Sequence, residues 1–128
     1  MIYLDTHVAV WLYNGSSELL TPAAAQAIDA NPLCVSPAVL LELQYLHEIG
    51  RISVEGSTVL QSLEASIELE LCQRSFADVV AVALTQTWTR DPFDRLIVAQ
   101  AALGNAPLLT KDQTIHAHYA RAFWEHGV

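Results

Sequence analysis

Four acidic residues interrupt or end apolar stretches of this chain. Asp5 and Asp112 each end a short apolar run, Glu42 lies inside one, and Asp94 precedes another. Ionised carboxylates are rarely buried unless they are paired, hydrogen-bonded or bound to a cation. We therefore expect the four carboxylates to share one site, and a divalent metal ion is the simplest group that would hold them together.

The apolar pattern predicts the elements that would position these acids. Short apolar runs alternate with helical stretches, which is typical of a parallel α/β sheet. Strands are expected at Ile2–Asp5, Leu33–Val35, Ile67–Leu71 and Pro107–Thr110, with a short edge strand near Ala122–Trp124. Helices are expected at Val8–Tyr13, Pro22–Ala30, Pro37–Ile49, around Val59–Leu63, after a capping box formed by Ser75 and Asp78, and at Pro92–Leu103.

On this frame the acids gather at one edge of the sheet. Asp5 and Asp112 follow predicted strands, at the carboxyl edge where open α/β sheets bind ligands. Asp94 lies in the first turn of a helix that would begin at the same edge. Glu42 would reach the edge from a neighbouring helix. The predicted fold therefore allows the four side chains to converge.

Several of these acids also have ordinary structural explanations. Asp91 precedes Pro92, so it is well placed as a helix N-cap. Asp94 could simply interact favourably with the helix dipole, and Asp112 could cap a short helix at Gln113–His118. Asp5 and Glu42 are harder to explain in this way, because each lies within or directly after an apolar run.

The histidines and cysteines carry a weaker signal. His116 and His118 are expected to be solvated surface residues, whereas His7 is a secondary site candidate because it lies close to Asp5. Cys34 and Cys72 are far apart and form neither a zinc-type nor a redox-type pair. We expect both to be buried reduced thiols.

The composition limits the class of protein. The 128 residues suit one domain spanning residues 1–128, and no apolar run is long enough for a membrane span. We expect a cytoplasmic protein whose 52% hydrophobic content serves a partner or dimer interface.

A net charge of −8 argues against tight nonspecific nucleic-acid binding, although bound divalent cations would reverse the local field. No glycine-rich phosphate loop or serine nucleophile elbow is present, which disfavours nucleotide hydrolysis and acyl transfer.

Four motifs together resemble the PIN-domain ribonucleases, and most closely the VapC-type toxins of bacterial type II toxin–antitoxin pairs. They are Leu4–His7, Ser36-Pro37 leading to Leu41–Leu43, Arg90–Ala101 and Leu109–Asp112. They cover nearly the whole chain, in order and at compatible spacing, and Arg90–Ala101 is the most specific. Thr87-Trp88-Thr89 lacks the histidine that close relatives would carry.

The resemblance implies a three-layer α/β/α fold with a central parallel sheet, and an endoribonuclease that leaves 5′-phosphate and 3′-hydroxyl ends. Asp5, Glu42, Asp94 and Asp112 match the acidic quartet that binds Mg²⁺ or Mn²⁺. Asp5 and Asp94 would be direct ligands, and Glu42 and Asp112 would complete the shell. The resemblance also implies an RNA substrate, a homodimer and a cognate antitoxin that covers the cleft.

Other residues near the quartet are secondary candidates. They are Thr6, His7, Asp91, Arg95, Thr110 and Lys111. Thr110 matches a hydroxyl position beside the last acid. Arg95 and Lys111 could hold RNA phosphates, although Arg95 could instead pair with Asp91 four residues earlier.

Three other functions remain open. A phosphatase could use Asp5 as its nucleophile, but phosphatases similar to haloacid dehalogenases place a second Asp two residues later, where this chain has His7. A receiver-like signalling domain could carry Asp5 in its acid cluster, but no phosphoacceptor strand is evident at midchain. A catalytically silent PIN-like binding module is disfavoured because all four acids are present.

Overall fold

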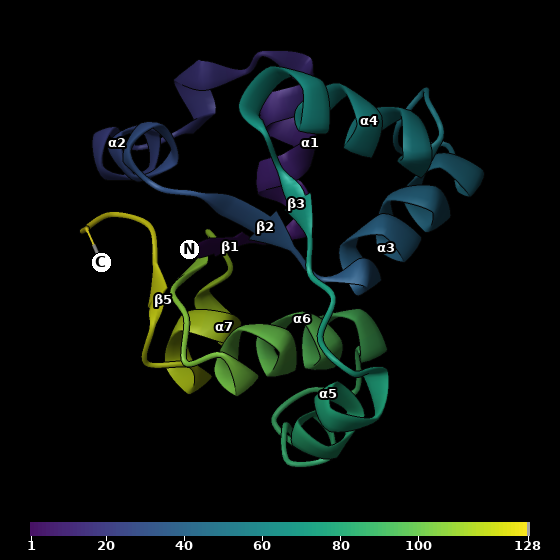
Figure 1. The fold of residues 1–128 in the computed structure, drawn as a ribbon, viewed down its shortest axis with the longest axis vertical. Coiled ribbons are helices and arrows are strands. Elements are labelled where there is room, and N and C mark those ends of the chain that lie inside the picture. The colour runs from purple at the N-terminus through teal and green to yellow at the C-terminus, as the bar shows by residue number, and fades with distance from the viewer. Residues whose placement is uncertain (128) are drawn as a thin grey trace.

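The centre of the protein is a single parallel β-sheet (Figure 1). The computed structural model describes residues 1–127, and within that range the sheet has five strands in the order β3–β2–β1–β4–β5. They are β1 Ile2–Leu4, β2 Leu33–Val35, β3 Glu70–Leu71, β4 Leu108–Leu109 and β5 Ala122–Phe123. Each neighbouring pair is parallel, which confirms the predicted α/β class.

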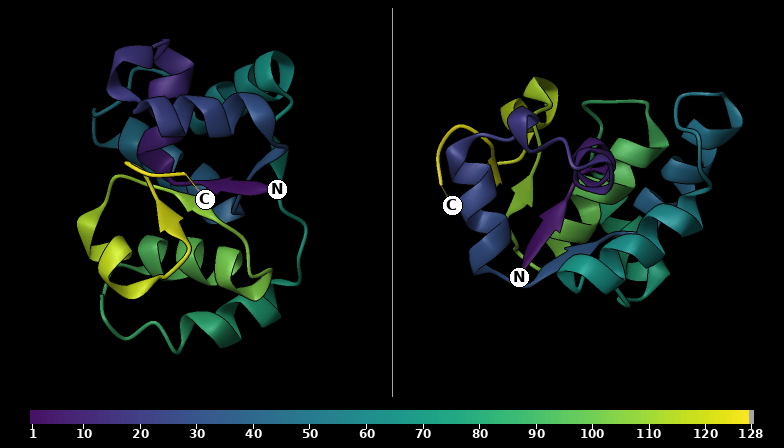
Figure 2. Two further views of the ribbon diagram at one scale, coloured as in Figure 1. Left: turned by 90° about the vertical axis from the view of Figure 1, so that its left-hand side faces the viewer. Right: turned by 90° about the horizontal axis from the view of Figure 1, so that it is seen from above.

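Helices cover both faces of this sheet, so the fold has three layers (Figures 1 and 2). The chain runs outward from β1 to β2 and β3 through α1 Thr6–Asn14, η1 Ser17–Leu19, α2 Pro22–Ala30, α3 Pro37–Glu48 and α4 Gly56–Ile67. It then crosses back to β4 and β5 through α5 Phe76–Ala83, α6 Pro92–Leu103 and α7 Gln113–His118. Because parallel crossovers are right-handed, this reversal puts α5, α6 and α7 on the opposite face from α1, α2 and α4.

The reversal creates a switch point between β1 and β4. These two strands are neighbours, with Leu4 aligned to Leu109, yet their outgoing helices α1 and α7 lie on opposite faces of the sheet (Figure 2). A crevice forms outside the carboxyl ends of strands at such a point, where open α/β sheets bind their ligands. The fold therefore directs attention to the residues that follow β1 and β4.

The core is formed by the strands and by the apolar faces of the helices that cover them. All three residues of β1 and of β2 are buried, as expected for parallel strands covered on both faces. Ile97 and Val98 of α6 and Val39 and Leu43 of α3 pack into the same core. Since strands of two or three residues have few ladder hydrogen bonds, burial of these side chains supplies most of the stabilisation.

Helix starts follow the predicted capping pattern closely. Thr21 caps α2 and Ser36 caps α3, each accepting a hydrogen bond from a backbone N–H of the first turn. Each is followed by Pro at the first helical position, where its missing N–H costs nothing. The short helix and the C-terminal edge strand predicted near residues 113–118 and 122–124 are both present.

Two local predictions are wrong. The strand expected over residues 67–71 is reduced to Glu70–Leu71, because α4 continues to Ile67 and Glu68 then turns the chain with a positive φ of 56°. The alternation of apolar and acidic residues there also fits the end of a helix. The capping box at Ser75 does not form, since the Ser75 side chain makes no capping hydrogen bond to α5.

The described part of the chain contains no helix that is long and apolar enough to cross a bilayer. Both cysteines are free, as expected; Cys34 is buried in β2, whereas Cys72 is only half-buried just after β3.

Candidate metal centre

Asp5 lies directly after β1, at the switch point, and is 6% exposed. Its Oδ1 accepts a hydrogen bond from the backbone N–H of Thr6 at 2.8 Å. Its Oδ2 accepts one from the hydroxyl of Thr110, which follows β4, at 2.6 Å. Burial raises the pKa of Asp5, and these two hydrogen bonds oppose that rise. The carboxylate is thus held between the ends of the two strands that flank the switch point.

Glu42 is linked to Asp5 through Thr6. The fully buried hydroxyl of Thr6 donates to Glu42 Oε1 at 2.5 Å, while the N–H of the same residue binds Asp5. Burial raises the pKa of Glu42, and the negative charge of Asp5 raises it further. Glu42 therefore reaches the carboxyl edge from α3, as the sequence predicted.

Asp94 lies half-buried in the first turn of α6. Burial raises its pKa to about 7, and the negative charges of Asp91, Asp5, Asp112 and Glu42 add to the rise. Within residues 1–127 its carboxylate accepts no hydrogen bond. Asp94 is therefore the member of the quartet whose two carboxylate oxygens are both without a hydrogen-bond donor in the described chain.

Asp91 and Asp112 act as N-caps, as the sequence predicted for Asp91 and allowed for Asp112. In each case Oδ1 accepts hydrogen bonds from the backbone N–H groups of the second and third helical residues, at 2.8 and 3.3 Å in α6 and at 2.8 and 3.1 Å in α7. Capping uses one oxygen of each carboxylate, so the second oxygen stays available. A cap role and a site role are therefore compatible for Asp112, whose side chain also lines the cleft at Asp5.

That cleft, referred to below as the Asp5 cleft, has a volume of about 330 Å³. It is lined by Asp5, His7, Trp11, Lys111 and Asp112. The first helix and the β4–α7 connection thus form its two walls. It brings together Asp5 and Asp112 of the acidic quartet, the secondary candidates His7 and Lys111, and the aromatic residue Trp11.

The donors fit a hard divalent cation by their chemistry. Carboxylate oxygens are the ligands that Mg²⁺ and Mn²⁺ prefer, and a cation would relieve the repulsion that raises the pKa of Asp94. Among residues 1–127, however, no three Asp, Glu, His or Cys side chains are grouped tightly enough to hold an ion as they stand. Asp5, Glu42 and Asp112 instead face local hydrogen-bond donors.

The two basic candidates occupy different surroundings. Lys111 is exposed and lines the Asp5 cleft. Arg95 is half-buried and donates from Nε to the carbonyl oxygen of Thr89 at 2.8 Å, which ties the start of α6 to the preceding loop. Of the two, Lys111 is the one directed at the Asp5 cleft.

The expectation that His116 and His118 are merely solvated is wrong for His116. Its Nε2 lies 2.7 Å from the carbonyl oxygen of Thr110, and the residue is half-buried. His118 is exposed, but its ring stacks on Trp88 with centroids 5.1 Å apart and an 8° interplanar angle. Both histidines therefore fix α7 against its neighbours and do not join the acids.

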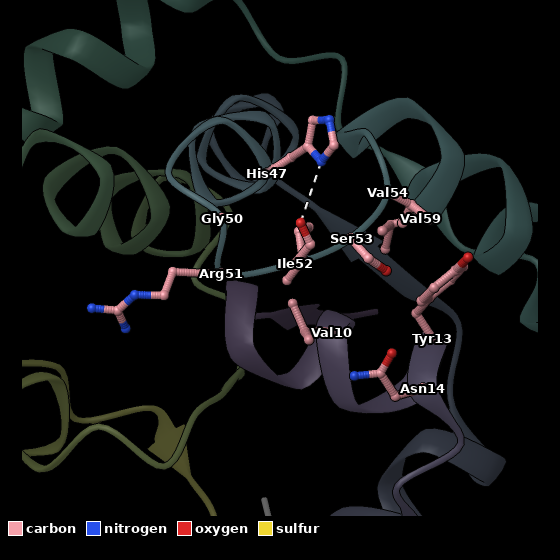
Figure 3. A pocket seen from close by; sticks show the side chains of 10 residues that line it. All are labelled: Val10, Tyr13, Asn14, His47, Gly50, Arg51, Ile52, Ser53, Val54 and Val59. Atoms are coloured by element: carbon pink, nitrogen blue, oxygen red, sulfur yellow. Dashed lines mark hydrogen bonds between the residues drawn. The ribbon is translucent and has the colours of Figure 1, made fainter.

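A larger cavity of about 600 Å³ lies between α1 and the α3–α4 connection (Figure 3). Its lining includes Val10, Tyr13, Asn14 and the segment from Gly50 to Val54, and the ring of His47 lies against the carbonyl oxygen of Ile52 at 3.3 Å. No acidic side chain lines it. The volume of a cavity therefore does not identify the candidate metal site, because the carboxylates line the smaller Asp5 cleft.

Sequence reasoning missed the role of two residues. Thr6 was a secondary candidate without an assigned contact, and it joins Asp5 to Glu42. Trp11 lines the Asp5 cleft, although it also packs against the core. The sequence does contain a sign of this role for Trp11. It lies four residues after the site candidate His7 on one helix, which places both side chains on the same helix face.

Comparisons with known proteins agree with this fold. The sequence pattern of the PIN domain matches residues 2–121. The chain is 36% identical over 120 residues to ribonuclease VapC22 of Mycobacterium tuberculosis, which covers 91% of each protein. VapBC2 from Rickettsia felis, solved with a DNA fragment from its promoter, matches with a TM-score of 0.61 and 26% identity over 91% of this chain and 92% of that chain. A toxin–antitoxin complex from Klebsiella pneumoniae shares the fold over the full length of both chains, with a TM-score of 0.67 and 17% identity.

Proposed function

Because the chain belongs to the PIN domain family, we propose that it is a divalent-metal-dependent endoribonuclease and the toxin of a VapBC-type toxin–antitoxin pair. The relative from Mycobacterium tuberculosis is a ribonuclease, and a structural neighbour is a VapBC complex. The proposal treats residues 1–128 as one PIN domain.

The observation that supports this function most strongly is the environment of Asp94. Four other carboxylates act on it electrostatically, two of them from the ends of β1 and β4. A fold gains no stability from gathering like charges at one edge, whereas a cation-binding site requires them. The concentration of negative charge at the switch point is thus best explained by a bound divalent cation.

Each acid has a proposed role in that site. Asp5 and Asp94 would bind the ion directly, and Glu42 and Asp112 would complete its shell; Mg²⁺ is the proposed ion, with Mn²⁺ as the alternative. When bound, such an ion lowers the pKa of a water molecule for attack on a phosphodiester and neutralises charge on the phosphate.

The surrounding residues of the chain hold this arrangement in place. Thr110 and Thr6 fix the two oxygens of Asp5, and Thr6 also orients Glu42. Lys111, exposed at the Asp5 cleft, is positioned to attract an RNA phosphate. In related metal sites such hydrogen-bonded supporting residues strongly affect metal affinity.

Two protein partners are part of the proposal. A cognate antitoxin would cover the cleft and silence the enzyme. A second copy of the chain would cover apolar residues of α3 and α5: Leu41 and Phe76 are 61% and 70% exposed, and both line one apolar cavity of about 230 Å³. Exposed apolar surface of this kind usually marks an interaction site.

The test is cleavage of structured RNA by the purified chain, freed of any antitoxin, with and without Mg²⁺ or Mn²⁺. Asp94→Asn should lower the rate by on the order of a thousandfold, the effect of losing several kcal/mol of transition-state stabilisation. Asp78→Asn is the matched control, because Asp78 occupies the first turn of α5 as Asp94 occupies that of α6.

Sequencing of the RNA ends identifies the chemistry. We expect 5′-phosphate and 3′-hydroxyl ends, and no product in excess chelator. Undiminished cleavage in chelator with 2′,3′-cyclic phosphate ends would refute the metal mechanism.

A further inference from the structure

We propose that the Asp5 cleft binds an unpaired nucleobase next to the bond that is cut, with the indole ring of Trp11 as its stacking surface. This inference rests on the proposed ribonuclease function and adds a substrate contact to it. Trp11 would be a binding and specificity residue, distinct from the acids that hold the ion.

The lining of the Asp5 cleft contains the groups that a nucleotide needs. Asp5 and Asp112 mark the side where a metal ion would hold the scissile phosphate, and Lys111 supplies a positive charge. His7 and Trp11 add two aromatic rings. The cleft thus has charged residues and aromatic residues side by side. A nucleotide likewise consists of a charged phosphate and a flat base, so the cleft can bind both parts.

The two rings are tilted against each other, so a base would stack beside His7 on the part of the indole that faces the Asp5 cleft. His7 and Trp11 lie on one face of α1, with centroids 6.3 Å apart and planes tilted by 46°. Because the rings are tilted and not stacked, His7 does not cover the whole face of the indole. Within residues 1–127 no buried polar side-chain atom lacks a partner; the indole N–H of Trp11 donates no hydrogen bond there, so it is open to solvent and to a ligand.

Trp11 is also held in place from behind. Its ring lies 5.7 Å from that of Trp124, tilted by 54°, and Trp124 is only 3% exposed. A half-buried ring backed by a fixed one loses little conformational freedom when a ligand stacks on it. This support distinguishes Trp11 from an aromatic residue that is exposed by chance.

The charge of the chain favours base stacking as a source of affinity for RNA. With six basic and fourteen acidic residues, the protein lacks the positive surface that usually attracts RNA phosphates. Unpaired bases stacked on aromatic side chains are the other main source of affinity for single-stranded RNA. Trp11 supplies that source beside the acidic quartet.

The inference is tested by RNA binding to the Asp94→Asn protein in Mg²⁺, so that cleavage does not interfere. The probe is a short fluorescent single-stranded RNA of mixed sequence, with a set of versions carrying one abasic nucleotide at successive positions. Trp11→Ala should weaken binding of the intact RNA by roughly tenfold, and Trp11→Phe should restore most of it. Trp88→Ala is the matched control, since Trp88 stacks on His118 outside the Asp5 cleft, and should bind normally.

The abasic set separates stacking from a general structural effect. At one position of the RNA, removal of the base should weaken binding to the Asp94→Asn protein that keeps Trp11. The same abasic RNA should bind the Trp11→Ala variant as well as the intact RNA does. If every abasic RNA loses the same affinity in both proteins, the stacking site does not exist. Thermal melting of each variant checks folding. If Trp11→Ala is unstable, Trp11→Leu replaces it, because leucine keeps an apolar side chain but has no ring to stack on, and it should weaken binding as Trp11→Ala would.

Failure of this inference and failure of the proposed function are distinguishable. Loss of cleavage in Asp94→Asn together with Trp11-independent binding would leave the nuclease intact and remove only the stacking site. Full cleavage by Asp94→Asn would instead overturn the nuclease mechanism.

Discussion

The hydroxyl of Thr110 donates a 2.6 Å hydrogen bond to Asp5 Oδ2 across 105 positions of sequence. Both residues are buried, and they follow the neighbouring parallel strands β1 and β4. The same Thr110 oxygen accepts the backbone N–H of Asp112 at 3.1 Å. One hydroxyl therefore sets the positions of two members of the acidic quartet relative to each other.

Replacement of Thr110 by Val should weaken binding of the catalytic ion by about 10- to 100-fold, the usual cost of removing a residue that orients a metal ligand. The isosteric side chain keeps the volume but leaves the Asp5 carboxylate and the Asp112 N–H without their partner. Isothermal titration with Mn²⁺, together with the metal concentration needed for half-maximal RNA cleavage, measures the effect.

Thr110→Ser is the control, because it retains the hydroxyl and loses only a methyl group. It should bind metal nearly as well as the wild type, although loss of a buried methyl will lower its stability slightly. Equal metal affinity in Thr110→Val and the wild type would show that this hydrogen bond does not orient the site.

Asp94 should make the protein less stable as the pH rises, when no divalent ion is present. Its folded-state pKa of about 7 lies above the ordinary aspartate pKa of 3.8 that it has in the unfolded chain. Between these two values the folded state keeps a proton that the unfolded chain has lost, so the free energy of unfolding falls as the pH increases through this window. In chelator at pH about 8, Asp94→Asn should therefore raise the melting temperature by roughly 3 °C.

At pH about 4 the same substitution should change the melting temperature little, because Asp94 is then protonated in the folded state. Asp78→Asn again provides the contrast. Asp78 is an exposed acid in the first turn of α5, so its neutralisation removes a favourable helix-dipole interaction and should be slightly destabilising. A lower melting temperature for Asp94→Asn at pH about 8 would show that the charges around Asp94 do not repel it.

Gly56→Ala should destabilise the pairing of α3 with α4. A Cβ at Gly56 would lie 2.8 Å from the backbone nitrogen of Gln44 and 2.9 Å from the carbonyl oxygen of Leu40, so the two helices would have to separate. We expect a loss of about 1–3 kcal/mol in the free energy of unfolding, typical of overpacking, measured by urea denaturation.

Gly127→Ala is the matched control, since nothing lies within 4 Å of a Cβ there. Its stability should equal that of the wild type. Equal stability of Gly56→Ala would mean that α4 can move away from α3 at little cost, and that Glu42 is less firmly positioned than the packing indicates.

The parts of the structure that follow from local chemistry could be predicted from the sequence. The caps Thr21, Ser36 and Asp91 were recognisable because each precedes a proline and offers a side-chain oxygen to the first helical turn. The placement of Asp5 after β1 followed in the same way, since a buried strand needs apolar residues and the acid marks its end.

The remaining features depend on contacts between distant segments. That Thr6 joins Asp5 to Glu42 depends on how α3 packs beside α1, and no local pattern encodes that distance. His116 looked solvated because its sequence neighbours are polar, yet the fold brings its ring to the carbonyl oxygen of Thr110. The strand predicted at residues 67–71 is shortened to Glu70–Leu71, because helix α4 extends to Ile67 and Glu68 takes a positive φ.

The order of strands also sets when the acidic site is complete during folding. Strands β1, β2 and β3 precede β4 in the chain and can pair with one another without it. Asp5 then has neither its hydrogen-bond partner Thr110 nor Asp112 beside it, because both residues follow β4. A partly folded chain of this kind holds three strands of the sheet but only part of the acidic quartet, so the site is completed only when β4 adds to β1.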